Sequence, residues 1–364
     1  MSRVRVIGID PGSGSWDILG LEGDDVFLDV SVPTKQVLAE PRKLLQVIES
    51  NEPLDTIVAP SGHGIPLKPI AAMTDSDIAK ANLRRSSDPH VMGIGKVLRM
   101  LKDAGIKGYV IPGVKQLETV KRCFKYNRID MGTADKVCAA AAAIVDQAGF
   151  LNIPLASTCF ILVEVGFGFN AYIAVENGKI VDGIGGSLGG MGFGTAGRLD
   201  GELAYLLDHV SKKDIYGGGL SAIVGHEDLT PKEIFLMAKK DERTADAVSG
   251  FYHDMLQGIF SLVPSFSDPS SIKEIIVSGR ASNEIAGQLV NFLKKPFSFP
   301  VRTVGSIARI SKTAAQGAAF IANGLAGGKH KGLVEIMALE KSNHDLLDDI
   351  YVGTVSLDRL GAQK

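Results

Sequence analysis

Two segments of the sequence place an acidic residue at the end of an apolar run and follow it with glycines. The first, at residues 8–15, reads Gly-Ile-Asp-Pro-Gly-Ser-Gly-Ser, and the second, at residues 164–170, reads Glu-Val-Gly-Phe-Gly-Phe-Asn. Glycine-rich turns expose backbone N–H groups, and such groups bind phosphate oxygens. A carboxylate at the lip of the turn can hold a hydrated Mg²⁺ ion. Both segments are therefore candidate phosphate sites.

The acidic residues of these segments are Asp10 and Glu164, and each has a simpler structural interpretation. Asp-Pro-Gly forms a type I turn in many contexts, and Glu164 could lie on an edge strand that faces water. A glutamate buried without a partner in an apolar strand is unfavourable, which favours a functional role or a strong partner. We predict that both carboxylates are catalytic and that Asp10 is the metal ligand. The predicted phosphate-binding residues are Gly12, Ser13, Gly14, Gly166, Phe167 and Gly168.

A third segment, at residues 275–283, reads Ile-Ile-Val-Ser-Gly-Arg-Ala-Ser-Asn. An apolar strand meets a helix here through small residues, so a flat ring system could lie against the backbone. This arrangement suits an adenosine pocket, although a plain strand-to-helix turn is the simpler interpretation. The predicted nucleotide-binding residues of this segment are Ser278, Gly279, Arg280 and Ser282.

Two glycine-rich loops follow the second phosphate segment. The loop at residues 182–201 alternates Leu, Met and Phe with glycine, a pattern too regular for a linker. It fits a mobile, partly apolar loop over a short acyl or carboxylate substrate, with Gly189 and Gly190 as substrate-binding residues. Arg198 could pair with a carboxylate or with a transferred phosphoryl group and is predicted to be catalytic. In the loop at residues 217–228, clustered glycines would again let the backbone come close to a ligand. The predicted nucleotide-binding residues of this loop are Gly217, Gly218 and Gly219.

Polar residues in the first half of the chain offer further candidates. His63 follows a strand end in a glycine turn and could line the substrate site. Asp135 stands at the start of an alanine-rich helix and is a candidate catalytic residue. Arg84 and Arg85 could bind an anion, but an exposed arginine pair is more often a solvated surface. We favour the solvated surface for this pair.

The expected elements follow the same order in two halves of the chain. In the first half, a strand at 4–9 leads into the glycine turn, and further strands, a helix from about Gln116 and an alanine-rich helix at 137–148 follow. In the second half, a strand at 160–165 leads into the second glycine turn, and a small-residue helix at 311–322 closes the half. We predict a duplicated α/β domain in which these two helices face each other at the hinge. Two unrelated α/β domains would give the same order by chance.

The length and composition bound the class of protein. The chain has 364 residues, enough for two domains, with 45% apolar and 22% charged residues. Its net charge of −2 gives no positive field for nucleic acid or an anionic membrane. No apolar run is long enough for a spanning helix, and we expect no signal peptide. The three cysteines fit no metal motif and suit a reducing, cytoplasmic location.

The five motifs together resemble the nucleotide site of the superfamily that contains acetate and sugar kinases, heat-shock chaperones and actin. Residues 10–14 and 164–168 look like its two phosphate motifs, and residues 278–282 look like its adenosine motif. Asp135 and residues 313–324 correspond to its two connecting helices. The resemblance implies ribonuclease H-like (actin-like ATPase) domains, with a mixed five-stranded sheet in each half and an interdomain cleft that binds ATP and Mg²⁺. The expected domains are residues 1–150 and 151–330, followed by a C-terminal extension at 331–364.

Within this superfamily, the chain is similar to the acyl kinases. The loops at 182–203 and 217–228 match in placement the substrate loop and the Gly-Gly-Leu loop of butyrate and acetate kinases. More specifically, the chain resembles an archaeal family of predicted butyrate kinases, formerly a domain of unknown function. It differs from acyl kinases at two positions, since they carry a His-Leu-Gly sequence at the second phosphate turn and a second glycine where this chain has Arg280.

The resemblance implies ATP-dependent phosphorylation of a small carboxylate to an acyl phosphate. Acyl kinases are commonly dimers, so a homodimer is expected on the same ground. A sugar or polyol kinase is an alternative in which Asp135, Glu164 or His63 would supply the base that a hydroxyl nucleophile needs. A nucleotide-dependent switch or assembly factor, driven by slow ATP hydrolysis, is a third hypothesis.

Overall fold

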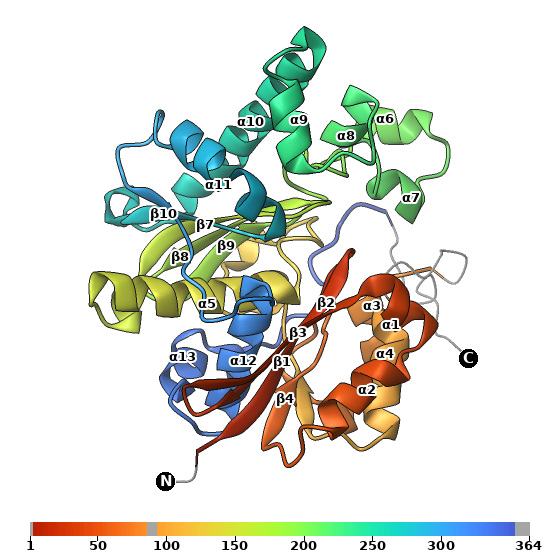
Figure 1. Ribbon diagram of the computed structural model, residues 1–364, viewed down its shortest axis with the longest axis vertical. Helices are drawn as coiled ribbons and strands as arrows, with labels where there is room; N and C mark the ends of the chain where they lie inside the picture. Colours follow the sequence, from red (N-terminus) through yellow and green to blue (C-terminus); the bar gives the residue numbers. More distant parts are fainter. Residues whose placement is uncertain (1–2, 86–92, 354–364) are drawn as a thin grey trace. The chain divides into compact units, whose positions relative to one another are not determined.

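The structure is a computed structural model that describes residues 3–85 and 93–353 (Figure 1). The chain forms two compact units. Unit 1 comprises the residues up to Thr158, Asn177–Ile180 and the residues from Gly305 onward, and unit 2 comprises Cys159–Glu176 and Val181–Val304. In the described ranges, no helix combines the length and the apolar character needed to cross a membrane.

The sheet of unit 1 is built around β1, the strand that carries the first glycine motif. Among the described residues it has six strands in the order β3-β2-β1-β4-β6-β5. β1 pairs antiparallel with β2 and parallel with β4, and β4 pairs parallel with β6. The strands are β1 (Arg5–Pro11), β2 (Ser15–Glu22), β3 (Asp25–Pro33), β4 (Thr56–Val58), β5 (Lys68–Pro69) and β6 (Gly108–Val110).

The sheet of unit 2 repeats this arrangement around β7, which carries the second glycine motif. Its order in the described chain is β11-β10-β7-β8-β9. β7 pairs antiparallel with β8 and parallel with β10, and β10 pairs parallel with β11. The strands are β7 (Cys159–Val165), β8 (Asn170–Glu176), β9 (Lys179–Ile184), β10 (Glu274–Ser278) and β11 (Val301–Thr303).

The central strands of the two sheets therefore match, with β7, β8 and β10 in the places of β1, β2 and β4. This agreement in order and direction confirms the predicted duplication. The prediction of five strands in each half was one strand short for unit 1, because a two-residue edge strand, β5, pairs antiparallel with β6.

Two sets of helices flank the sheet of unit 1. In Figure 1, α1–α4 lie on one side of β1, β2 and β4, and α12 and α13 lie on the other. Apolar residues of the first set, such as Val37, Leu44 and Val97, are buried in one core with Ile7 and Ile57 of the sheet. The helices are α1 (Thr34–Ala39), α2 (Arg42–Glu49), α3 (Asp75–Asn82), α4 (Ile94–Asp103), α5 (Ala134–Leu151), α12 (Thr313–Leu325) and α13 (Lys331–Ile336).

Small residues allow β1, α12 and α5 to pack backbone against backbone. A Cβ atom on Gly8 of β1 would lie 2.1 Å from the backbone nitrogen of Ala319 in α12. A Cβ atom on Gly317 of α12 would lie 1.7 Å from the carbonyl oxygen of Cys138 in α5. The two helices that the sequence predicted to face each other are therefore in direct contact, and their lack of side-chain bulk is required by that contact.

The helices of unit 2 bury an aromatic core against its sheet. The ring centroids of Phe193 and Phe251 lie 4.9 Å apart, and Phe235 contacts both rings. Ile161 and Val163 of β7 belong to the same core. The helices are α6 (Gly201–Leu206), α7 (Lys212–Ile215), α8 (Leu220–Val224), α9 (Pro231–Met237), α10 (Glu242–Leu262) and α11 (Arg280–Leu293).

Several expectations about unit 1 need correction. No α-helix starts at Gln116, because residues 114–124 form two 3₁₀ turns, the first with the buried side chains of Lys115 and Gln116. Arg84 is only 9% exposed, so the favoured interpretation of a solvated arginine pair was wrong for that residue. The compact units also divide the chain differently from the predicted boundaries at 150 and 330, since α12 packs on β1 and α5 of unit 1.

The C-terminal extension packs on unit 1 as far as the structure describes it. Asp349 accepts hydrogen bonds from Arg122 at 2.9 Å and from the ring of His344 at 2.8 Å. The Lys115 ammonium donates to the carbonyl oxygen of Asp348 at 2.7 Å. A salt bridge joins Lys80 to Asp345. These contacts hold the described part of this segment against the rest of unit 1.

Candidate phosphate turns

The first glycine turn closes on itself and leaves two donors free. The Gly12 N–H donates to the carbonyl oxygen of Ser15 at 2.9 Å, and Thr34 donates to the carbonyl oxygens of Gly12 and Gly14. Within the described part of the chain, the N–H groups of Ser13 and Gly14 have no hydrogen-bond partner. Two adjacent free N–H groups at the end of a buried strand are suited to an anion.

The second glycine turn has the same construction. The Gly166 N–H donates to the carbonyl oxygen of Phe169 at 3.0 Å, three residues on, as in the first turn. The N–H groups of Phe167 and Gly168 have no hydrogen-bond partner among the residues described. In the paired strands, Asp10 lies opposite Asp17, and Glu164 lies opposite Ala171 at the corresponding position. Glu164 is therefore the structural counterpart of Asp10.

Asp10 is buried, with an exposed fraction of 3%, and forms an ion pair that the sequence did not predict. Its Oδ2 atom lies 2.5 Å from the Lys312 ammonium. Its Oδ1 atom is buried and has no hydrogen-bond partner in the described structure. Burial raises the pKa of the Asp10 carboxyl, and the charge of Lys312 offsets only part of that increase.

Lys312 is held in the charged form by the same group of residues. Burial by itself would lower the pKa of Lys312, but the carboxylates of Asp10, Asp17 and Asp135 outweigh it and raise the pKa. The ammonium also lies against the first glycine turn, because a Cβ atom on Gly12 would be 2.5 Å from Nζ. No local signal in the sequence marks Lys312, since it simply precedes a small-residue helix.

Asp135 lies in the first turn of α5, where Lys136 and Thr133 lower the pKa of its carboxyl group. Burial alone would raise the pKa of Asp135, but Lys136 at 2.7 Å and the hydroxyl of Thr133 lower it below its ordinary value. The turn that contains His63 is adjacent, because the Ala134 N–H donates to the carbonyl oxygen of Gly62 at 2.9 Å. Two predicted site residues of unit 1, His63 and Asp135, therefore belong to neighbouring segments at the start of α5.

The predicted adenosine segment lies directly on the end of β7. Ser278 is paired in register with Glu164 of β7. Its hydroxyl is buried and has no hydrogen-bond partner in the part of the chain described. Gly279 has a φ of +98°, and a Cβ atom there would lie 2.4 Å from the carbonyl oxygen of Val165. Arg280 begins α11, and Ser282 donates to the carbonyl oxygen of Gly279 at 2.6 Å.

The glycine loops of unit 2 pack on the second phosphate turn. The carbonyl oxygen of Gly168 accepts from the Gly194 N–H and from the Thr195 hydroxyl, both at 3.2 Å. Thr195 in turn forms a β-bridge with Gly218, and a Cβ atom on Gly219 would lie 2.3 Å from the Thr195 nitrogen. The structure therefore brings the residues at 166–168 and 217–219, predicted separately from the sequence, into one connected region.

The other predicted residues of the long loop contact α10. A Cβ atom on Gly190 would lie 2.6 Å from the Cβ atom of Asp254, and the carbonyl oxygen of Gly189 accepts from the Arg198 N–H. The Arg198 side chain, 51% exposed, pairs with Asp254 at 3.3 Å and donates to Gln257 at 2.7 Å. Close packing explains why Gly189 and Gly190 lack side chains. Asp254 and Gln257 of α10 hold the Arg198 side chain.

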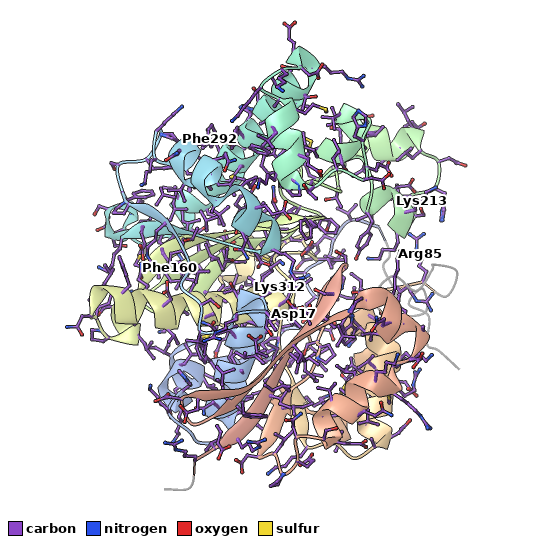
Figure 2. The ribbon with its side chains drawn as sticks, in the orientation of Figure 1. Asp17, Arg85, Phe160, Lys213, Phe292 and Lys312 are labelled. Atoms are coloured by element: carbon purple, nitrogen blue, oxygen red, sulfur yellow. The ribbon has the colours of Figure 1, made fainter. Side chains whose placement is uncertain are left out.

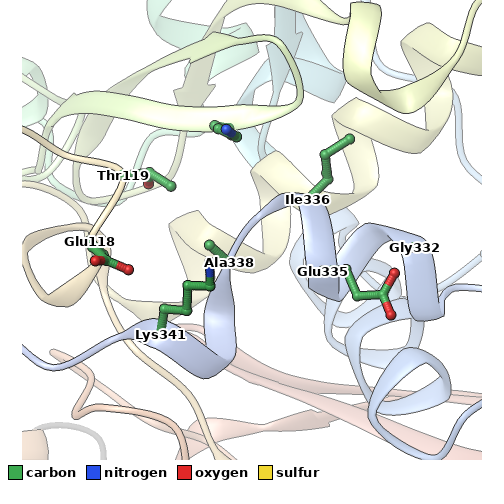
Figure 3. Close-up of a pocket in the computed structure, with 8 residues that line it drawn as sticks. Glu118, Thr119, Gly332, Glu335, Ile336, Ala338 and Lys341 are labelled. Carbon is green, nitrogen blue, oxygen red and sulfur yellow. The ribbon is translucent and has the colours of Figure 1, made fainter.

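A separate shallow pocket of about 580 Å³ lies in unit 1 (Figure 3). It contains none of the predicted site residues. Its charged lining consists of two glutamates and two lysines, which offset one another: Glu118, Glu335, Lys179 and Lys341.

The strand order and the paired turns define the actin-like ATPase fold, in which two related α/β units each carry a glycine turn at the end of a central strand. The sequence matches the model of a family described as protein of unknown function (DUF1464) over residues 8–352, so the chain belongs to that family. No curated protein shows significant sequence similarity to it.

Three solved structures illustrate the similarity. A propionate kinase from Francisella tularensis subsp. tularensis SCHU S4 has a TM-score of 0.60 at 16% identity, covering 87% of this chain and 99% of its own. Acetate kinase from Porphyromonas gingivalis has a TM-score of 0.59 at 14% identity, with coverages of 87% and 98%. The Lmo2764 protein from Listeria monocytogenes, provisionally assigned as an N-acetylmannosamine kinase, has a TM-score of 0.50 at 15% identity, with coverages of 87% and 98%. These TM-scores show a shared fold.

Proposed function

We propose that the protein is an ATP-dependent kinase that phosphorylates a small carboxylate, as butyrate kinase does. The observation that carries the proposal is the repeated turn, which follows a carboxylate in each unit and offers two free N–H groups. The similarity in fold to propionate and acetate kinases supports a carboxylate as the acceptor.

The residues of the chain would act mainly by binding and by neutralising charge. The N–H groups of Ser13 and Gly14, and those of Phe167 and Gly168, would donate to phosphate oxygens. An oxygen of the acceptor carboxylate would attack the γ-phosphorus while the bond to the β–γ bridging oxygen breaks, and ADP would leave with that electron pair. A carboxylate is already nucleophilic, so no proton has to be removed.

The site offers one atom that fits a magnesium ion. Asp10 Oδ1 is a buried carboxylate oxygen without a hydrogen-bond partner among the described residues, and Mg²⁺ is commonly held by one or two such oxygens together with substrate phosphates. A bound Mg²⁺ would neutralise charge on the nucleotide phosphates. Asp135 and Glu164 would contribute from further away, and Arg198 would neutralise the transferred group after leaving Asp254.

A sugar or polyol kinase is the second candidate, and the position of Asp135 favours it. This carboxylate stands at the start of α5, beside the turn that contains His63, where a base could act on a hydroxyl. The lowered pKa of Asp135 keeps it ionised at neutral pH, as a base must be.

An acceptor panel tests the proposal. The protein is incubated with ATP, Mg²⁺ and either short-chain acids or sugars and polyols, and acyl phosphate is trapped as hydroxamate. We expect hydroxamate with at least one acid, and a loss of roughly 100-fold or more in the Asp10→Asn variant. Sugar phosphate without hydroxamate would favour the second candidate, and an unchanged rate in Asp10→Asn would contradict the assigned site.

A further inference from the structure

The segment before α12 is fixed to the sheet of unit 1 by a buried and a partly buried carboxylate. Asp29 of β3 accepts from the N–H groups of Arg309, Ile310 and Ser311 at 2.7, 2.9 and 2.8 Å. Asp17 of β2 accepts from the Lys312 N–H at 2.9 Å. Four consecutive backbone donors are thus bound by two strands, so the chain has little freedom at this point.

The Asp17 anchor is itself rigid. Its side chain is fully buried, and its Oδ1 atom accepts from the hydroxyls of Ser15 at 2.9 Å and Ser31 at 2.6 Å. Figure 2 shows Asp17 and Lys312 side by side in unit 1. The backbone of Lys312 is thus bound to Asp17 of β2, and its side chain reaches Asp10 of the neighbouring strand β1.

The Lys312 ammonium therefore occupies a defined position beside Asp10 and Gly12. It lies 2.5 Å from Asp10 Oδ2, and a Cβ atom at residue 12 would lie 2.5 Å from it. Gly12 is thus needed to admit the ammonium, besides forming the turn. The Lys312 ammonium already pairs with one oxygen of the carboxylate that the proposed function assigns to metal.

A second cation at Asp10 would meet this ammonium at short range. Two like charges a few ångströms apart in a buried setting repel by several kcal/mol at an effective dielectric constant of about 20. Asp10 Oδ1 has no hydrogen-bond partner among the described residues, whereas a metal ion at Oδ2 would lie directly beside the ammonium.

We propose that Lys312 is a tethered cation that competes with divalent metal for Asp10, with Asp17 and Asp29 as its positioning residues. In the absence of nucleotide, Lys312 neutralises the phosphate turn and keeps its affinity for metal low. Metal then binds tightly only when phosphate oxygens supply further ligands and draw the ammonium toward themselves. This inference deepens the proposed function at the same site.

The test measures binding of Mn²⁺ alone, without nucleotide or acceptor, by the decrease of the free Mn²⁺ signal in electron paramagnetic resonance. We expect the Lys312→Met variant to bind one Mn²⁺ at least about tenfold more tightly than the unmodified protein. The double variant Asp10→Asn/Lys312→Met should lose that gain. Equal or weaker binding in Lys312→Met, or a gain that persists in the double variant, would overturn the proposal.

Two further variants keep the test decisive. Lys312→Gln removes the charge but keeps a donor for Asp10, and it replaces Lys312→Met if that variant fails to fold. Asp29→Asn leaves the charges of Asp10 and Lys312 in place but loosens the segment at 309–311. It should therefore give a smaller gain in Mn²⁺ affinity than Lys312→Met. No gain would refute the positioning role of Asp29. Fluorescence of Trp16, which is fully buried in β2, reports folding. Because no ATP is present, the outcome does not depend on whether acyl transfer occurs.

Discussion

Asp10 and Glu164 occupy the same position in two copies of one fold, yet their surroundings differ. Asp10 is paired with Lys312, whereas Glu164 lies in register with Ser278 of β10. The first turn therefore has the Lys312 ammonium beside its carboxylate. On the antiparallel neighbour strand, Asp17 lies opposite Asp10 and Ala171 lies opposite Glu164. The proposed function places the metal ligand at the first turn.

A residue outside the site offers a pH-dependent probe of unit 1. Burial, with a smaller effect of Lys329, lowers the pKa of His330 to about 4, and its ring stacks on Phe320 at 4.3 Å. In the unfolded chain a histidine has a pKa of about 6.5. Between these values only the unfolded state binds the proton, so the free energy of unfolding falls as the pH falls from about 6.5 to about 4.

We expect His330→Phe, which keeps the ring stack, to remove this acid sensitivity. In urea unfolding at a series of pH values, the free energy of unfolding of the variant should rise relative to that of the unmodified protein as the pH falls. The relative increase should be on the order of 2 kcal/mol near pH 4. His226→Phe, at an exposed position, is the matched control and should show no such gain. Parallel pH profiles for His330→Phe and the unmodified protein would refute the assignment.

At the scale of elements, the contact between α5 and α12 depends on the absence of side chains. We predict that Gly317→Ala lowers the free energy of unfolding by about 3 kcal/mol or more, since its Cβ atom would lie 1.7 Å from the Cys138 carbonyl oxygen. Gly149→Ala in α5 is the control, because its Cβ atom would meet nothing within 4 Å and alanine favours the helix. Chemical denaturation compares the two variants, and similar stabilities would be inconsistent with backbone-to-backbone packing.

The C-terminal segment is a second element whose contacts can be tested. Asp349 is 2% exposed at its side chain and holds Arg122 and His344. Asn keeps its shape and tolerates its φ of +60°, so Asp349→Asn removes mainly the charge. Because the Arg122 side chain is 69% exposed, we expect a loss of only about 1–2 kcal/mol in unfolding free energy. Asp25→Asn breaks the exposed pair with Arg3 and should cost less than about 1 kcal/mol, and equal losses would count against an anchored segment.

The sequence predicts the glycine turns of the site better than the side chains that pair with them. The glycine turns could be found because a strand, an acidic residue and clustered glycines are adjacent in the chain. The Asp10–Lys312 pair could not, because it joins opposite ends of the chain and 39 residues are lysine or arginine. The 3₁₀ turns at 114–124 were missed for a related reason, since the burial of Lys115 depends on the carbonyl oxygen of the distant Asp348.

For the whole molecule, the duplicated topology is the property that the sequence predicts most completely. Repeated order of strands and turns implies repeated sheets, and the two sheets match in strand order and direction. The extent of each unit could not be predicted in the same way. Residues 305–353 follow unit 2 in the chain but belong to unit 1, because the small-residue faces of α12 require β1 and α5 as partners.

The central claim is that two equivalent turns bind the phosphates of one class of ligand, and amide NMR tests it most directly. ATP and Mg²⁺ are added to the deuterated, isotope-labelled protein, and the backbone amide signals are followed. The account predicts that the amides of Ser13, Gly14, Phe167 and Gly168 shift together with a single affinity. Shifts confined to other residues, such as Lys179 and Lys341 of the shallow pocket, would contradict it.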